Sequence, residues 1–458
     1  MSTTDPAARL VAERPSAAPP RPWRFPAFVR REFGAGRMLV CNIPGHPLAV
    51  MSLVMDAGAT TEPAGQEGVA QVLAGVLSEG TERLDAYGFA VESERLGAVW
   101  RAHADWDSMR CGFEVPVDNL LPAAHLLADA VRAPGRDDAT VERVRDERVD
   151  EIQLERSQPG PRAAAAFSGA VFADGTRYST PDGGEPASVG SLSADDVRRF
   201  HAQRCGPATA TAIVVGDLTG VDVDAVGEAL FAGWDSAAAP APAPRVSARS
   251  EGRRILVVDR PGSVQSMLYA GHDGPPRSTP DYVAMTTMAL VLGGMFNSRL
   301  NYRLREDKGY SYGAFGGFDA RRHGGVFSAR SAVQTEVTAP ALADAVQELV
   351  TMHESGVTAE ELEQARSYRA GVFPINFATP GAVAAGLGDL VVHELPDDHF
   401  DRLRQQVLDI SADEINAAAQ LRLRPADLVS VVVGDAGRVA AELEATGLGP
   451  VQVVSDEA

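Results

Sequence analysis

Short sequence patches recur along this chain at a constant spacing of 218 residues, and this repeat constrains the fold more than any other feature. One such match carries little weight, but several in the same order indicate a duplicated structural unit. The chain has 458 residues, which is enough for two copies that each bury a core. The matching patches are Ser-Ala-Asp at 193–195 and 411–413, Pro207 and Pro425, and Val-Val-Gly-Asp at 214–217 and 432–435.

Both copies predict the same local structure. Each has a serine followed three residues later by an acid, which is a helix-capping pattern, and then passes through a proline into a β-branched strand and another helix. A looser echo pairs 122–148 with 340–366, each an apolar helix, a turn and a charged helix. The capping pairs are Ser193 with Asp196 and Ser411 with Glu414, the strands are 211–215 and 428–433, and the later helices are 223–231 and 437–445.

Alternating alanines and prolines at 235–245 separate the copies and favour an extended spacer. Within each copy, pairs of strand-like segments alternate with helices, which predicts an α+β fold with a mostly antiparallel sheet and fits a parallel doubly wound fold less well. The strand pairs are expected at 37–55 and 98–115, and at 254–272 and 310–334. The expected divisions are a flexible amino-terminal arm over 1–36, a first domain over 37–234, a linker over 235–248 and a second domain over 249–458.

The charge balance argues against nucleic acid as a partner. There are 42 basic and 62 acidic residues, a net charge of −20, and such a chain repels phosphate backbones and anionic lipid. The three cysteines form no CxxC pair, so neither a disulfide framework nor a cysteine zinc site is expected. No stretch reaches the roughly 18 apolar residues of a membrane span. We therefore expect a cytoplasmic chain with no membrane association.

Two local patterns could suggest catalysis or metal binding, and neither fits its context. His103, Asp105 and Asp107 alternate as ligands could, but they lack a recognised spacing, so we expect a solvated hairpin end. Ser311 lies in a GxSxG pattern, the nucleophile elbow of serine hydrolases, which needs a strand before it and a helix after it. Here a helix over 298–308, ended by Gly309, is predicted before it and a strand after it. No HExxH, HxxEH or phosphate-binding motif occurs.

The stretch from Leu292 to Tyr312, LGGMFNSRLNYRLREDKGYSY, resembles the second-domain signature of the insulinase/pitrilysin-like zinc peptidases. Mitochondrial processing peptidase and its paired bacterial relatives belong to that group, and the similarity extends in order over about residues 37–458. The resemblance implies two homologous α+β domains that form a half-clamshell. Two such halves enclose a chamber that accepts extended peptides in the family.

Active members of the family hold zinc with an HxxEH motif in the first domain and a distant glutamate. Alignment of the flanking glycines places residues 71–75, Gln-Val-Leu-Ala-Gly, on that motif, so both histidines and the catalytic base are missing. Glu151 stands where the third ligand is expected and Glu147 one helical turn earlier, but one carboxylate cannot hold catalytic zinc. We expect these two glutamates to be helix-surface charge. No metal or other cofactor is expected on this chain, and zinc is expected in a partner.

The family also uses an arginine and a tyrosine seven residues apart, which reach from the second domain toward the substrate. Arg305 and Tyr312 match this pair. A phenol hydroxyl can donate to the oxyanion formed in peptide hydrolysis, and a guanidinium can hold a substrate carbonyl. The resemblance implies a non-catalytic subunit that pairs with a homologous HxxEH-containing peptidase in peptide hydrolysis or precursor processing and is inactive alone. The alternative is a catalytically silent structural or peptide-binding clamshell protein.

Overall fold

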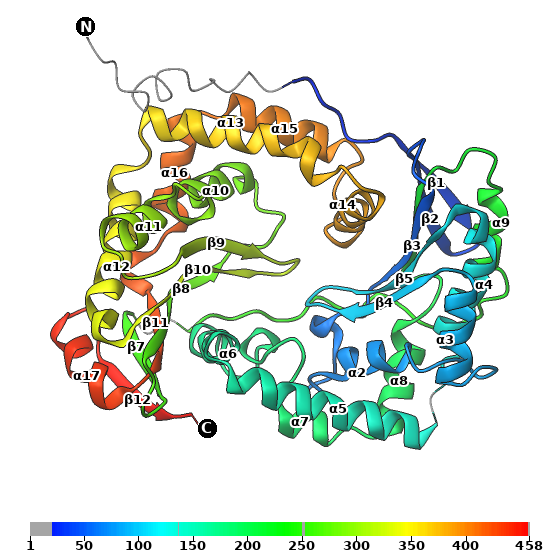
Figure 1. The fold of residues 1–458 in the computed structure, drawn as a ribbon, viewed down its shortest axis with the longest axis horizontal. Helices are drawn as coiled ribbons and strands as arrows, with labels where there is room; N and C mark the ends of the chain where they lie inside the picture. The colour runs from blue at the N-terminus through cyan, green and yellow to red at the C-terminus, as the bar shows by residue number, and fades with distance from the viewer. Residues whose placement is uncertain (1–20, 136, 250–251, 457–458) are drawn as a thin grey trace, which may run out of the picture.

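Two six-stranded sheets, each covered by helices, form the protein (Figure 1). A computed structural model describes residues 21–135, 137–249 and 252–456. The first sheet has the strand order β1-β2-β6-β3-β5-β4 and the second β12-β7-β11-β8-β10-β9. The first-sheet strands are β1 Phe28–Phe33, β2 Gly36–Asn42, β3 Leu48–Met55, β4 Val99–Ala104, β5 Met109–Pro116 and β6 Ala210–Gly216. The second-sheet strands are β7 Arg254–Asp259, β8 Gln265–Gly274, β9 Ala314–Ala320, β10 Gly325–Gln334, β11 Val429–Gly434 and β12 Val451–Ser455.

The sheets confirm the repeat that the sequence predicts. The five strands β2 to β6 lie in the same spatial order as β7 to β11, and β2 and β7 begin 218 residues apart. In each sheet the ladders β3·β5·β4 and β8·β10·β9 are antiparallel, as are β6·β3 and β11·β8. Parallel pairing is confined to β2·β6, β7·β11 and β7·β12 among the named strands. The predicted mostly antiparallel α+β fold with two homologous halves is therefore confirmed.

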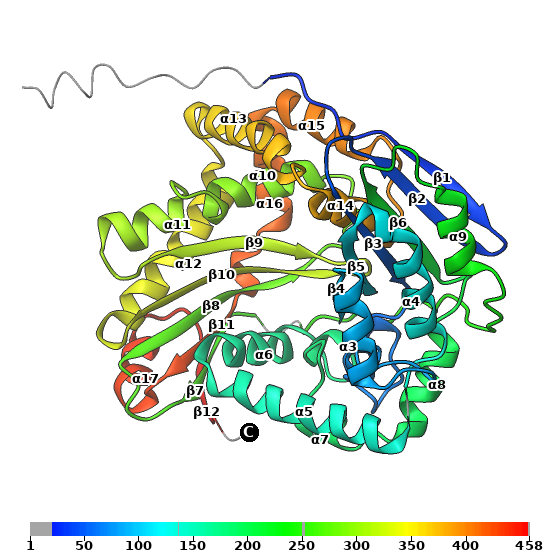
Figure 2. The ribbon, with the colours of Figure 1, turned by 45° about the vertical axis from the view of Figure 1, so that its right-hand side comes forward.

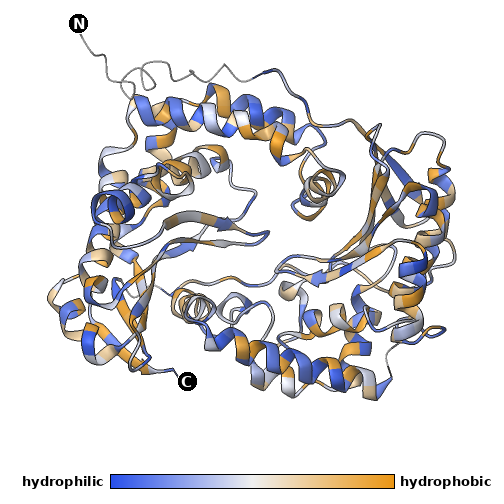
Figure 3. Ribbon diagram, viewed as in Figure 1, coloured by the Kyte–Doolittle hydropathy of each residue, from blue (hydrophilic) through white to orange (hydrophobic). Residues whose placement is uncertain are grey.

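Helices cover the sheets and form the periphery. In Figure 3 hydrophilic and hydrophobic residues alternate along the outer helices α5 and α13, as expected for helices with one face on the core. The helices of the first half are α2 Val69–Val76, α3 Ala86–Arg95, α4 Leu120–Arg132, α5 Asp138–Ser157, α6 Pro159–Val171, α7 Pro186–Gly190, α8 Ala194–Arg204 and α9 Val223–Phe231. Those of the second half are α10 Tyr282–Ala289, α11 Arg299–Asn301, α12 Thr338–Ser355, α13 Ala359–Asn376, α14 Pro380–Val392, α15 His399–Asp409, α16 Ala412–Arg422 and α17 Ala436–Ala445.

The predicted capping pairs begin α8 and α16. The Ser193 hydroxyl accepts a hydrogen bond from the Asp196 N–H, and the Asp196 carboxylate accepts one from the Ser193 N–H at 2.9 Å. Ser411 and Glu414 make the same reciprocal pair at the start of α16, where the Glu414 carboxylate lies 2.8 Å from the Ser411 nitrogen. Each pair satisfies backbone donors that the first helical turn leaves free.

The two halves interlock because each contributes one helix to the sheet of the other. Helix α6 belongs to the first copy but packs on β8 and β11, with Phe167 and Val171 in one cluster with Val431. Helix α14 belongs to the second copy but packs on β3 and β6, with Leu387 in one cluster with Ile213. Both helices begin with a proline and follow the second long helix of their copy. They therefore occupy corresponding places in the repeat, and Figures 1 and 2 show each lying against the opposite sheet.

The segments that join and precede the halves differ partly from expectation. Residues 235–247 form no helix or strand, and the division of the chain at 235–248 stays a prediction. The arm predicted over 1–36 ends earlier, because 28–33 form β1 on the edge of the first sheet. The strand is mostly exposed, so it lacks the apolar alternation by which a strand is recognised. Residues 1–20 lie outside the described residues.

One finding concerns membrane association. Among the described residues no single helix is long and apolar enough to cross a bilayer, although α13 and α14 together meet the length and composition requirement with a bend of 112° between them.

The corresponding hairpins of the two halves meet at their tips. The Arg322 backbone N–H, between β9 and β10, donates to the Asp107 carboxylate at 2.7 Å, and the Arg322 guanidinium donates to Asp56 at 2.9 Å. The Arg321 guanidinium lies 4.0 Å from the centre of the Trp106 ring. Asp107 is 6% exposed, and this burial raises the pKa of its carboxyl to about 6. The second half therefore shields an acid of the first half from water.

We expect Leu387→Ala in α14 to lower the free energy of unfolding of the whole chain by about 2–5 kcal/mol, because it opens a cavity between the halves. Urea denaturation followed by circular dichroism should show a single shifted transition. Leu421→Ala is the control, since Leu421 is 62% exposed and its loss should change stability by no more than about 0.5 kcal/mol. Two separate transitions, only one of them shifted, would contradict the interlocked arrangement.

We expect Asp107→Asn to gain stability relative to the wild type as pH rises. Because the pKa of Asp107 is raised in the folded state, its stabilising contribution is complete below the unfolded-state pKa of about 4 and is lost as pH rises through about 6. Asparagine does not titrate, so the difference in unfolding free energy, variant minus wild type, should increase between about pH 4 and pH 7. Urea denaturation at several pH values measures this difference. A difference that is constant or falls with pH would be inconsistent with a buried acid.

Candidate functional site

The segment with the resemblance folds as two π-helical turns on either side of a loop and the short helix α11. These turns are η4 Leu290–Gly294 and η5 Tyr302–Asp307. Gly309, with φ +64°, ends the second turn, and its N–H donates to the Arg305 carbonyl at 3.1 Å. The predicted helix over 298–308 is therefore present and ends at Gly309, but most of it is π-helical. Such wide turns occur frequently at functional sites.

Asn301 joins the two segments on which Arg305 and Tyr312 lie. Its side-chain amide donates to the Phe296 carbonyl, and its oxygen accepts from the Ala314 N–H at 3.3 Å. The Asn301 side chain is buried, and Ala314 begins β9 just after Tyr312. The sequence analysis did not identify Asn301. The only sequence feature that could have indicated it is a polar side chain between Leu300 and Leu304 in a helical segment.

Arg305 and Tyr312 both project donors into solvent. The Arg305 guanidinium lies 4.6 Å from the centre of the Phe296 ring, a cation–π contact that fixes its position. The Arg305 side chain is 34% exposed, and its nearest acid is Glu306 at 3.5 Å. Tyr312 is fully exposed, and Phe296 and Tyr302, which come earlier in the same segment, are also exposed. The sequence analysis did not identify Phe296 as part of this site.

The degenerate zinc motif lies in α2, where ordinary core packing takes its place. Gln71 accepts a hydrogen bond from the Ala104 N–H at 3.2 Å at the end of β4. Ala74 is buried, and a Cβ atom on Gly75 would lie 2.7 Å from Cγ1 of Val144 in α5. The place of the second histidine is therefore filled. These residues do not fit a catalytic zinc ion.

The two glutamates of α5 have arginine partners on their own helix. Glu147 pairs with Arg143 at 2.7 Å and Glu151 with Arg148 at 3.0 Å, and both acids are more than half exposed. Within the described residues no group of three or more His, Cys, Asp or Glu side chains could hold a metal ion. The two glutamates therefore lie on the helix surface in ion pairs.

Helix α2 is anchored at its start by a buried ion pair although it lacks the zinc ligands. The buried Glu62 carboxylate accepts hydrogen bonds from the N–H groups of Gly68 and Ala70, at 3.1 and 2.9 Å, at the start of the helix. Its second oxygen lies 2.7 Å from the Arg177 guanidinium. The guanidinium also donates to three backbone carbonyls, so the buried pair is fully hydrogen-bonded.

The two other patterns, the His103, Asp105 and Asp107 group and Ser311, do not form sites in the structure. Asp105 accepts hydrogen bonds from the N–H groups of Asp107 and Ser108 within its turn, whereas Asp107 binds the opposite hairpin. His103 faces a groove, and its burial lowers the pKa of its imidazole. Ser311 follows η5 and precedes β9, the reverse of a nucleophile elbow, and its hydroxyl has no hydrogen-bond partner.

We expect the combined substitution Gln71→His, Ala74→Glu and Gly75→His to recreate the motif without recreating a zinc site. It should lower the unfolding free energy by about 1–3 kcal/mol, because the new side chain at 75 overlaps Val144. Dialysis against zinc followed by metal analysis and urea denaturation measures both effects. Adding Val144→Ala is the matched control and should recover part of the lost stability. Stoichiometric zinc in the triple variant would contradict this account of α2.

Comparisons with known proteins agree with a peptidase-like fold that lacks the zinc motif. Residues 37–176 match the model described as insulinase (peptidase family M16), and residues 191–368 match the model described as peptidase M16 inactive domain. An uncharacterised zinc protease of Mycobacterium leprae is 23% identical over 84% of this chain and 87% of its own length. A Helicobacter pylori protein described as a non-peptidase homologue is 22% identical over 89% of this chain and 94% of its own.

Solved structures show the same fold. The peptidase M16 inactive domain from Pseudomonas fluorescens superposes with a TM-score of 0.83 at 23% identity, over 89% of this chain and 98% of that one. A chain of complex III from Candida albicans has a TM-score of 0.74 at 12% identity, over 91% and 97% of the two chains. The two family models together, the absent zinc motif and this fold show that the chain is an insulinase-like member of peptidase family M16, of the inactive kind.

Proposed function

We propose that this chain is the non-catalytic subunit of a two-subunit zinc peptidase, in which it places Arg305 and Tyr312 opposite the zinc site of an HxxEH-containing homologue. The observation that carries the proposal is that one segment presents both a fully exposed Tyr312 and the Arg305 guanidinium, which is held by an exposed Phe296. Among the described residues Tyr312 has no hydrogen-bond partner, and the one ion pair of Arg305 is with its sequence neighbour Glu306 at 3.5 Å. This arrangement is expected of half a site that a second chain completes.

The chemistry of the two side chains fits peptide hydrolysis. Attack of water on a peptide carbonyl places negative charge on its oxygen, and the Tyr312 hydroxyl can donate a hydrogen bond to that oxygen. The Arg305 guanidinium can bind a neighbouring carbonyl of the substrate and add positive charge. The partner would supply the zinc ion and the base. The substrate would be an extended peptide, in general peptide hydrolysis or in precursor processing.

The segments that carry Arg305 and Tyr312 are held in place by hydrogen bonds and packing. This supports a present role in substrate binding, because a pair of residues left over from a lost function would not need to be held. Asn301 holds both segments through backbone contacts, and Phe296 limits the guanidinium to one face of its ring. Preorganisation of this kind reduces the entropy lost when a substrate binds. The description of a related H. pylori protein as a non-peptidase homologue agrees with inactivity of the isolated chain.

A structural or peptide-binding role without hydrolysis is the second candidate. The observation in its favour is the fold that this chain shares with a subunit of a respiratory complex III structure. A scaffold of this kind needs no donors at Arg305 and Tyr312, so its assembly should be indifferent to their loss.

We expect Tyr312→Phe to lower the kcat of the complex with its HxxEH partner by about 100-fold, because it removes one donor to the oxyanion. Arg305→Ala should lower kcat/KM as well. Hydrolysis of a quenched peptide, measured with and without a chelator, reports both effects. Tyr302→Phe is the matched control, since Tyr302 is also an exposed tyrosine of this segment.

Tyr312→Phe should not change folding, because the exposed hydroxyl of Tyr312 contributes no more than about 0.5 kcal/mol. Unchanged activity in both variants would contradict the proposed role of the pair. A native complex that lacks chelator-sensitive hydrolysis would favour the structural candidate instead.

A further inference from the structure

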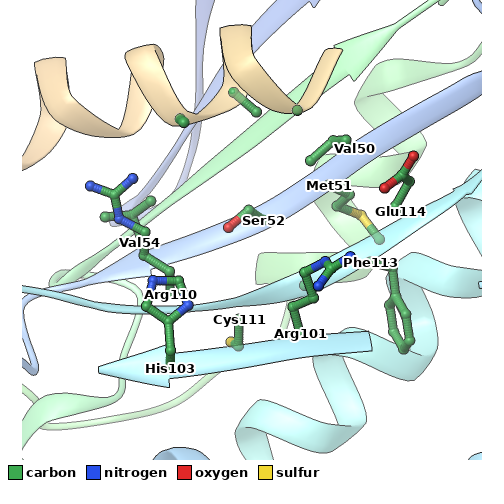
Figure 4. Close-up of a pocket in the computed structure, with 14 residues that line it drawn as sticks. Val50, Met51, Ser52, Val54, Arg101, His103, Arg110, Cys111, Phe113 and Glu114 are labelled. Carbon is green, nitrogen blue, oxygen red and sulfur yellow. The ribbon is translucent and has the colours of Figure 1, made fainter. Parts of the chain in front are cut away.

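A groove of about 400 Å³ lies on the inner face of the first sheet, separate from Arg305 and Tyr312 (Figure 4). Its floor is formed by side chains of β3, β4 and β5, and its roof by α14. The volume lies within the range of pockets that bind small ligands or a few residues of a peptide. The groove is therefore large enough to take a few residues of a peptide.

Small residues on α14 create the space. Gly381, Ala384 and Ala385 are spaced i, i+3, i+4 on one helical face and line the groove. The corresponding helix of the other half, α6, has the same small residues at its matching positions, Gly160, Ala163 and Ala164. It differs further along, where it has Phe167 in place of Gly388, and the ring centre of Phe167 lies 5.6 Å from that of Tyr269 in β8.

The groove contains an arginine that is unpaired among the described residues, in a protein that is strongly acidic overall. Arg101 and His103 project from β4 on the same side, and Arg110 from β5 lies beside them (Figure 4). Arg110 pairs with Asp389 of α14 at 3.0 Å. Arg101 is exposed and makes no ion pair or hydrogen bond with the described residues, although Glu114 also lines the groove. A guanidinium without a partner at the edge of an apolar floor favours binding of a carboxylate.

The floor defines what else the ligand must contain. Val50 and Val54 line it together with the Ser52 hydroxyl, so apolar atoms face the ligand beside the cationic edge. The chain's net charge of −20 argues against a polyanion such as nucleic acid. A short ligand with one carboxylate and apolar groups fits both the charge and the lining.

We propose that this groove binds a carboxylate of an extended peptide, with Arg101 as its principal cationic contact. The inference rests on the proposed function only in taking the ligand to be a peptide. It adds a substrate class to that function, namely peptides that carry an acidic side chain or a free carboxyl terminus near the bound segment.

The test uses the isolated full chain and short fluorescein-labelled peptides, with binding followed by fluorescence anisotropy. One amidated peptide has a central glutamate, a second has lysine in its place, and a third has no charged side chain but a free carboxyl terminus. The glutamate peptide should bind at least about ten-fold more tightly than the lysine peptide. Comparison with the third peptide shows whether the carboxylate comes from a side chain or from the chain end.

Two substitutions and a control locate the binding. Arg101→Glu should remove the preference for the carboxylate peptides, whereas Arg24→Glu, the same charge change on the exposed segment before β1, should leave it intact. Ala385→Leu fills the groove from an exposed helical position without changing charge and should weaken binding about ten-fold. Circular dichroism confirms that each variant is folded.

Binding of the glutamate peptide that is unchanged in Arg101→Glu, or unchanged in Ala385→Leu, would overturn the inference. Equal binding of the glutamate and lysine peptides would also overturn it. Because these measurements need no partner subunit, their failure would leave the proposed role of Arg305 and Tyr312 untouched. Conversely, loss of that role in the hydrolysis assay would not remove carboxylate binding by the isolated chain.

Discussion

The reciprocal exchange of α6 and α14 is the packing interaction on which the rest of the molecule depends. Each helix buries its apolar face on the sheet of the opposite half, so one face of each sheet is covered by the other copy. The same exchange brings the two equivalent hairpins together, where Asp107 accepts from Arg322. The relative position of the halves is thus set by apolar burial and then fixed by polar contacts.

The two halves share one fold but differ in the functional residues that they carry. The first keeps α2 anchored by Glu62 and Arg177 but has side-chain packing where zinc ligands would stand. The second keeps a loop between π-helical turns that projects Arg305 and Tyr312. This division agrees with the proposal that the second half of this chain acts on a substrate held by another subunit.

Much of the fold could be predicted from the sequence because its helix ends and strands are determined by short local patterns of residues. The Ser193 and Ser411 caps, the paired strands and the Gly309 helix end all depend on neighbouring residues, and all are confirmed. The helix exchange could not be predicted, since α6 and α14 have the same amphipathic pattern whichever sheet they cover. Strand β1 was missed because both its faces are largely exposed. The role of Asn301 depends on side-chain hydrogen bonds that its sequence pattern does not indicate, and the groove arises from contacts between segments distant in sequence.

The most direct test of the central claim is to replace Tyr312 with photoreactive benzoylphenylalanine in the natural host and to identify the crosslinked peptide by mass spectrometry. The fully exposed position of this side chain allows the replacement without loss of packing. We expect the crosslink in a homologous subunit, close to its HxxEH motif. A crosslink confined to chains without that motif, or to a second copy of this chain, would contradict the claim that Arg305 and Tyr312 complete a partner's active site.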